Sequence, residues 1–390
     1  MAIIRFLQIV ALSIIILIIG YNYNPSNFNT YGELINGHTM PIMALLVFLL
    51  ATSANKIPTA LRIPEIRKYI LLYIGIIVLV LTFYGAGLIA ETSDIRTMFI
   101  PLIGLIIGSC MELGGRRMSF AIWCYIAIIG VVLMQQIMVN IGGFEILDYY
   151  LTNAKNAFGP MVCMAALASF TMALYPKTGS LMSIVYILAA IALCVGLLTI
   201  RARFATVVLF VLALIIFIRY LRGAGKSPKK SIVSFTIIGV VVVLLLNETA
   251  RTYIINSLFQ NRETDITSGR TEAYTEAINV FLDNPWFGNI DLQQSIGWAH
   301  NYLLLQLSNY GIIGGLPWII LYIYLGIKVI VGILKSDLFK IENIGWIFAS
   351  VSFFVSLAEP TYPYGPGTTN LIPFILLGMA LREKHNNITQ

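Results

Sequence analysis

The chain has 390 residues, of which 58% are hydrophobic and 11% charged, and its formal net charge is +7. Soluble domains carry about 25% charged and about 45–50% apolar residues, so a water-soluble fold could not hide this much apolar surface. The apolar runs also lack the two-residue alternation of a membrane β-barrel. Because backbone amides in hydrocarbon must be paired within their own segment, we expect an all-α integral membrane protein.

Apolar segments long enough to be spanning helices recur along the whole chain, which predicts a single polytopic membrane domain over residues 1–390. The first lacks a small-residue cleavage site before Tyr21, so we interpret it as a helix and not as a removed signal peptide. We expect about twelve transmembrane helices, near 3–20, 40–54, 69–90, 97–112, 119–140, 158–175, 180–199, 204–219, 232–246, 303–327, 343–358 and 369–381.

The four cysteines lie inside these apolar runs. Small thiol side chains in such surroundings are typical of core packing, and not of a disulfide framework or a metal cluster. We therefore expect neither a disulfide nor a metal site at these cysteines. The cysteines are Cys110, Cys124, Cys163 and Cys194.

Charge predicts the topology. With both termini placed in the cytoplasm, 18 of the 25 Lys and Arg residues but 5 of the 18 Asp and Glu residues fall on the cytoplasmic side. This excess follows the positive-inside rule and explains the basic pI without a nucleic-acid partner. The one long extracytoplasmic loop is then residues 247–300. The seven outer basic residues are Arg96, Lys155, Arg201, Arg203, Arg251, Arg262 and Arg270.

Three features of the outer side depart from its acidic character. Arg201 and Arg203 occupy a short connection between two apolar helices, where a guanidinium is costly unless it snorkels or meets an anion. Arg270 lies in the first turn of a helix predicted after Ser268 and ended by Asn284-Pro285. That position favours phosphate; a salt bridge to Glu263, Asp265 or Glu272 is the alternative.

The predicted loop helix has an apolar side that we expect to rest on the membrane bundle. Its members are Ala273, Ile278, Val280 and Phe281.

The third feature is His300, which falls where the long loop meets the next spanning helix, with Asn301 directly after it. An imidazole with an ordinary pKa of about 6.5 is mostly neutral there and able to accept a proton. A packed interfacial histidine is the alternative. Together with the arginines, His300 predicts a site that places a base beside a polyanion. No zinc spacing, nucleotide-binding glycine loop or Ser/His/Asp order accompanies it.

Three segments in this half of the chain resemble the O-antigen ligase and polymerase superfamily, in that family's order, over roughly residues 195–335. They are "RFATVVL", which follows its arginine motif; "SGRTEAYTEAINVFLDNPWFG", which has its arginine, short helix and Asn-Pro before Gly; and "AHNYLLLQLSNYGIIGG", which has its His-Asn and glycine pattern. One departure is that Ala202 and Phe204 flank Arg203, where the family has Ser or Thr before and Gly after. Arg201 therefore competes for the role of the first arginine.

The resemblance implies a multi-helix membrane glycosyltransferase of the bacterial inner membrane, with a periplasmic active site. The implied donor is a glycan on undecaprenyl pyrophosphate, and no metal or cofactor is needed. Arg203 and Arg270, with Arg201 as the competitor, would bind the pyrophosphate, and His300 would act as base. Asn301 and Glu359 are candidate supporting residues. Glu359 would orient His300 or bind the acceptor sugar, unless it is an ordinary exposed loop carboxylate.

The acceptor decides between two activities within this family. A polymerase transfers the chain onto another lipid-linked repeat unit, whereas a ligase transfers it onto lipid A-core of lipopolysaccharide. We favour the polymerase, because the acidic outer face offers few basic residues for a phosphorylated core. A chain-length regulator is a further implied partner. From another class, a lipid-linked oligosaccharide flippase would need ionisable groups near the middle of the spans, which are almost free of charge.

The partition of basic residues gives a direct test of topology. Cysteines introduced singly at Ser227 and Ser268 should react with an impermeant thiol reagent from opposite sides of intact membranes. Reaction of both from one side would contradict the placement of the long loop and of the site with it.

Overall fold

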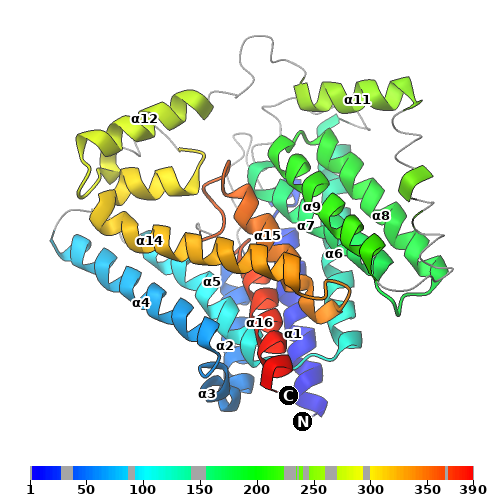
Figure 1. Ribbon diagram of the computed structural model, residues 1–390, viewed down its shortest axis with the longest axis horizontal. Coiled ribbons are helices and arrows are strands. Elements are labelled where there is room, and N and C mark those ends of the chain that lie inside the picture. The colour runs from blue at the N-terminus through cyan, green and yellow to red at the C-terminus, as the bar shows by residue number, and fades with distance from the viewer. Residues whose placement is uncertain are drawn as a thin grey trace. The chain divides into compact units, whose positions relative to one another are not determined.

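A computed structural model describes residues 2–27, 38–86, 93–141, 155–223, 234, 237–239, 246–259, 270–292, 299–364 and 368–389. Within these ranges the regular secondary structure is helical and contains no strand (Figure 1). The predicted all-α class is confirmed for this part of the chain.

Seven helices are long and apolar enough to cross a membrane in the part of the chain that the structure describes. Two shorter apolar helices, Phe99–Cys110 and Ile341–Val355, also coincide with predicted spans. The predicted span at 232–246 lies largely outside the described residues. The fold is thus that expected of an integral membrane protein, while the number of twelve spans and the sidedness of the long loop stay predictions.

The helices group into two compact units whose segments alternate along the chain. Unit 1 contains Met1–Leu45, Leu113–Glu263 and Asp337–Ile347; unit 2 contains Leu46–Glu112, Thr264–Ser336 and Phe348–Gln390. A single membrane domain over residues 1–390 remains a prediction.

Unit 1 is built around α7, a helix with almost all of its side chains buried. It packs against α6, α8 and α9, and α6 in turn packs against α1. Small residues let the backbones approach, since a Cβ on Gly159 would lie 2.5 Å from that of Ala202. The helices of this unit are α1 (Ala2–Tyr21), α6 (Gly115–Ile141), α7 (Lys155–Leu174), α8 (Ser180–Thr199), α9 (Arg203–Arg222) and α11 (Glu248–Phe259).

Unit 2 contains the closest helix pair, α5 and α16. A Cβ on Gly108 would lie 1.9 Å from the carbonyl oxygen of Ile375, and one on Gly378 would lie 2.3 Å from that of Leu105. Close contact through small residues is a common way to associate helices in lipid. The remaining elements include α2 (Thr39–Ser53), which unit 1 shares, and α15 (Ile344–Val355), which begins in unit 1. The others are α3 (Ile57–Ala60), α4 (Pro64–Gly85), α5 (Ser93–Cys110), α12 (Arg270–Asp283), α14 (Tyr302–Lys335) and α16 (Leu371–Thr389).

All four cysteines are free thiols; three are buried and Cys194 is partly so, which confirms their prediction as packing residues.

An ionic cluster joins the segment after α5 to the segment before α3 and to α16. The carboxylate of Glu112 pairs with both Lys56 and Arg382. Its hydrogen bonds with these two cations lower the pKa of Glu112 to about 2. All three residues belong to the side predicted to be cytoplasmic.

The long helix α14 is broken at Gly311, whose φ of 61° and ψ of −160° are not helical. The turn after α12 supplies the hydrogen bonds that the break removes. Ile312 and Ile313 donate from their backbone N–H groups to the carbonyls of Pro285 and Trp286, at 2.8 and 3.0 Å. In return Asn289 N–H donates to the Ser308 carbonyl at 2.8 Å. Backbone bonds therefore fix α12 to α14.

Two glycines make this contact sterically feasible. Gly288 (φ 70°) and Gly311 (φ 61°) both adopt the left-handed region. A Cβ on Gly288 would lie 2.5 Å from the backbone of Asn309, and one on Gly311 would lie 2.4 Å from that of Trp286. These are the glycines of the "NPWFG" and "NYGIIGG" segments. The first glycine of each segment is thus required sterically by this contact.

Alanine at either glycine should lower the unfolding temperature, because it combines a penalty of roughly 1 kcal/mol for positive φ with a backbone clash. The matched control is Gly75→Ala on α4 of the same unit, where an added Cβ meets nothing within 4 Å. Thermal unfolding in detergent measures the difference. Equal unfolding temperatures for Gly311→Ala and Gly75→Ala would contradict the role given to this contact.

Candidate functional site

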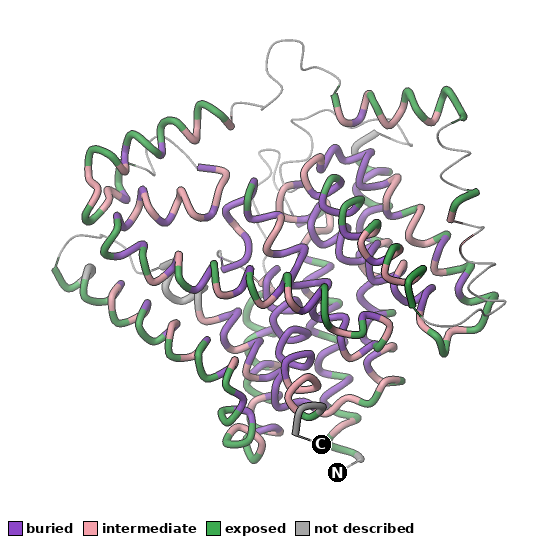
Figure 2. The backbone as a smooth tube through the Cα atoms, viewed as in Figure 1, coloured by how far each residue is buried: buried purple, intermediate pink, exposed green. Residues whose placement is uncertain are grey.

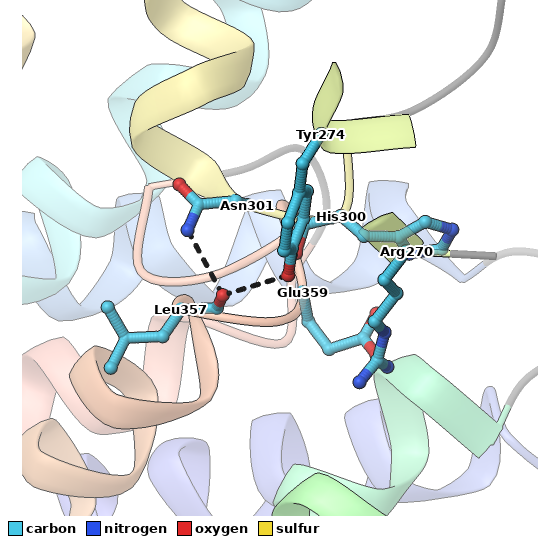
Figure 3. A network of polar contacts seen from close by, with 6 residues as sticks. All are labelled: Arg270, Tyr274, His300, Asn301, Leu357 and Glu359. Atoms are coloured by element: carbon cyan, nitrogen blue, oxygen red, sulfur yellow. Dashed lines mark hydrogen bonds and ion pairs between the residues drawn. The ribbon is translucent and has the colours of Figure 1, made fainter. Parts of the chain in front are cut away.

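Arg270 is the first residue of α12 and forms an ion pair with Glu359, 2.7 Å between Nη2 and Oε1 (Figure 3). The Glu359 side chain is 8% exposed and that of Arg270 24%. A guanidinium carries five N–H donors in a fixed plane, and this is its one hydrogen bond to a described residue. The buried carboxylate therefore orients Arg270 from one edge and leaves other donors for an anion.

This pairing changes two interpretations made from the sequence. Glu359 is not an ordinary exposed carboxylate, because only 6% of the residue is accessible. The described partner of Arg270 is Glu359, and not Glu272; Glu263 and Asp265 lie outside the described residues. Local reasoning could not find this partner, since Arg270 and Glu359 are 89 positions apart in the sequence.

His300 lies two residues before α14, in a left-handed conformation with φ 49°. Its side chain is half-buried, and its Nδ1 is buried without a hydrogen-bond partner among the described residues. Burial, and then the positive charge of Arg270, lower the pKa of His300 below its usual 6.5. The imidazole is consequently neutral at pH 7 and has an acceptor nitrogen to offer.

Asn301 fixes the histidine from the next position. Its Oδ1 caps α14 by accepting from the N–H of Leu304 at 3.1 Å, and its Nδ2 donates to the carbonyl of Leu357 at 3.1 Å. The N–H of Tyr302 donates to the carbonyl of Ser356 at 3.1 Å. The start of α14 is thereby held to the turn after α15, which also carries Glu359.

Tyr274 joins the three segments of the site. It follows Arg270 by four residues, so both side chains leave the same face of α12. Its hydroxyl lies 3.3 Å from the carbonyl of His300 and 3.4 Å from that of Leu357, and can donate to either. Figure 3 shows Asn301 and Tyr274 converging on the Leu357 carbonyl. Four-residue spacing could have indicated Tyr274 from the sequence; nothing there indicated Leu357.

A layer of buried aromatic rings supports the start of α14. Tyr302 stacks on Tyr322 with ring centroids 5.7 Å apart, and meets Trp318 and Tyr364 edge-on at 6.3 and 5.9 Å. The Tyr322 hydroxyl hydrogen-bonds the Ser356 Oγ at 2.8 Å. Such packing stabilises a fixed geometry beneath His300.

Arg201 and Arg203 belong to unit 1, in the turn between α8 and α9. Arg201 is 8% exposed and has a φ of 53°, so its left-handed backbone makes the turn. Arg203 is the first residue of α9, and its Nε donates to the carbonyl of Ser257 on α11 at 3.4 Å. Thr199 and Tyr253 share a hydrogen bond of 2.6 Å beside it. Helix α11 thus packs on this turn, and the burial of Arg201 disfavours simple snorkelling for that residue.

The predicted site residues therefore fall into two groups. Arg270, His300, Asn301 and Glu359 come together in unit 2, and Arg201 and Arg203 share one turn of unit 1. No contact between His300 and Glu359 is among the described hydrogen bonds; Glu359 instead holds Arg270. Among the described residues, no three His, Cys, Asp or Glu side chains gather as a metal site would require.

The apolar side predicted for α12 is partly corrected. The helix packs against α14 and buries Ala277 and Val280, whereas Ile278 is 41% exposed. The helix ends at Asp283, directly before Asn284-Pro285, as the sequence predicted; the predicted N-cap, Ser268, lies outside the described residues.

Comparison with known proteins gives one match to a family. A family model described as O-antigen ligase matches residues 188–289. This segment contains Arg201, Arg203 and Arg270 and ends before His300. The resemblance to the O-antigen ligase and polymerase superfamily is therefore confirmed. No curated protein matches the chain.

The ion pair predicts a measurable coupling. Arg270→Gln and Glu359→Gln should each lower the unfolding temperature, because each leaves a charge in a partly buried site, at a cost of about 1–2 kcal/mol after allowance for solvent screening. The double variant should lose less than the sum of the two. Strictly additive losses in detergent would show that the two residues do not interact.

Proposed function

We propose that this chain, whose residues 188–289 match the O-antigen ligase family, is a membrane glycosyltransferase that transfers a glycan from undecaprenyl pyrophosphate to a sugar hydroxyl. We place the reaction at the outer face of the inner membrane. The observation that carries the proposal is the arrangement in unit 2, where Glu359 orients the guanidinium of Arg270 close to a neutral His300.

Arg270 serves the leaving group. As the bond from the anomeric carbon to the pyrophosphate breaks, negative charge grows on the departing oxygen, and a preorganised guanidinium stabilises it. The planar fork suits two phosphate oxygens at once. We assign the same role to Arg203 because it matches the arginine motif of the family; Arg201 is the alternative for this first arginine.

His300 serves the nucleophile. A sugar hydroxyl attacks poorly, and a neutral imidazole within hydrogen-bond reach accepts its proton as the new glycosidic bond forms. The products are the extended glycan, protonated His300 and undecaprenyl pyrophosphate, so atoms and charges balance. A single displacement inverts the anomeric centre. Asn301 and Tyr274 act as positioning residues, because Tyr274 donates to the carbonyl of His300 and Asn301 caps the helix that follows it.

We favour a polymerase of lipid-linked repeat units, because the predicted outer face is acidic and suits a phosphorylated core acceptor poorly. A ligase acting on lipid A-core is the second candidate, and the description of the matching family favours it.

The glycan phenotype of a strain lacking the gene separates these activities. Lipid A-core with a single repeat unit indicates the polymerase, and bare core with long chains retained on undecaprenyl pyrophosphate indicates the ligase. Normal long surface chains would contradict both.

In complementation, Arg203→Lys and Arg270→Lys should fail, since an ammonium group cannot reproduce the planar fork of the guanidinium. Arg201→Ala should be milder; the reverse order for Arg201→Ala and Arg203→Ala would identify Arg201 as the first arginine.

The base is tested in vitro with purified lipid-linked donor. His300→Ala should slow the chemical step about 10²–10⁴-fold while donor binding survives. Because only the neutral imidazole accepts a proton, the wild-type kcat/KM, which reports the free enzyme, should fall on acidification with a midpoint below the usual 6.5 that reflects the lowered pKa. A folded His300→Ala protein with near-normal turnover would exclude the base role, and full loss of activity with a chelator would exclude the metal-free mechanism.

A further inference from the structure

An apolar patch on α12 and the turn after it is uncovered. It consists of Ile278, Leu282 and Trp286, with Leu282 63% and Trp286 61% exposed. The next stripe around the helix is polar and also exposed; it consists of Glu272, Glu276, Asn279 and Asp283. Helix α12 therefore has one face against α14, one exposed apolar face and one exposed acidic face. Figure 2 shows how much of α12 is exposed.

The neighbouring helix α14 indicates that lipid covers the patch. After its break, α14 is a candidate membrane span, and large apolar residues are exposed along it at helical spacing. A stripe of this kind on a spanning helix faces lipid. The stripe consists of Ile312, Ile313, Leu316, Ile320, Ile323 and Ile327.

The patch is continuous with this lipid-facing stripe through the backbone. The first two residues of the stripe, Ile312 and Ile313, are the ones whose N–H groups donate to Pro285 and Trp286. The turn is thus held at the depth where the stripe begins. An exposed indole at that depth is typical of the membrane–water boundary, where its ring is buried in lipid and its N–H stays hydrated.

We propose that the apolar patch is seated in the lipid of the adjacent leaflet, so that α12 is an interfacial helix and not a free part of a water-exposed loop. The occupant is bulk membrane lipid, and the acidic stripe lies in water, as in other amphipathic helices at interfaces. This places Arg270, at the start of the same helix, near the headgroup layer. The anchoring stands on exposure and backbone contacts, and does not depend on the proposed glycosyl transfer.

Tryptophan fluorescence in vesicles tests the seating. Wild type and Trp286→Phe are reconstituted in phosphatidylcholine with brominated acyl chains, and the difference between their emissions gives the Trp286 component. Trp123→Phe supplies the reference, because Trp123 is 52% exposed on the candidate span Gly115–Val139. We expect brominated lipid to quench the Trp286 component about as strongly as the Trp123 component, and aqueous iodide to quench it weakly.

Strong quenching by iodide with little by brominated lipid would overturn the proposal, since the patch would then face water. Loss of bromolipid quenching on adding lipid-linked donor would also overturn it, by assigning the patch to the donor's polyprenyl chain. Should Trp286→Phe fail to fold, Leu282→Trp adds a reporter to the same patch, and its added emission must show the same lipid quenching and iodide protection.

Discussion

The break in α14 is the constraint from which the geometry of unit 2 follows. A helix interrupted within a candidate span leaves backbone groups unpaired, and a buried backbone group without a hydrogen bond costs about 1–3 kcal/mol. Here the carbonyls of Pro285 and Trp286 accept the N–H groups that the break at Gly311 frees. The exchange uses backbone atoms, so it fixes α12 to α14 directly, and it leaves no room for a side chain at Gly288 or Gly311. Arg270 lies at the far end of α12 and His300 just before α14, so one contact positions both.

Electrostatics then sets the chemical state of the site. The buried Glu359 carboxylate compensates the charge of Arg270, which allows a guanidinium to remain in a half-buried place. Burial of the imidazole and, after it, the charge of the same guanidinium lower the pKa of His300 below its usual value, so the imidazole is neutral at pH 7. A phosphate group bound to Arg270 would offset part of that positive charge and so raise the proton affinity of His300. In the proposed mechanism, donor binding therefore strengthens the base that the reaction needs.

Local patterns in the sequence predicted a good part of this. Asn284-Pro285 ended α12 because proline cannot continue a helix, and Arg270 and His300 stood out as a charged and a titratable residue beside apolar segments. Contacts between segments far apart in the sequence could not be predicted from local sequence patterns. The burial of Glu359, the Leu357 carbonyl as an acceptor and the exposed face of Ile278 depend on how α12, α14 and the turn after α15 meet. Which of Arg201 and Arg203 binds the pyrophosphate also stays open, because the two residues lie close together at the turn between α8 and α9.

The coupling between Arg270 and His300 is the central claim, and the pH profile of kcat/KM for the residual activity of Arg270→Gln tests it most directly, because kcat/KM reports the pKa of His300 in the free enzyme. Purified protein and lipid-linked donor give the profile, with Arg270→Lys as the variant that keeps the charge. If the guanidinium lowers the pKa of His300, the acidic limb of Arg270→Gln must move to higher pH than in wild type, while that of Arg270→Lys stays close to it. An acidic limb that Arg270→Gln leaves in place would contradict the account.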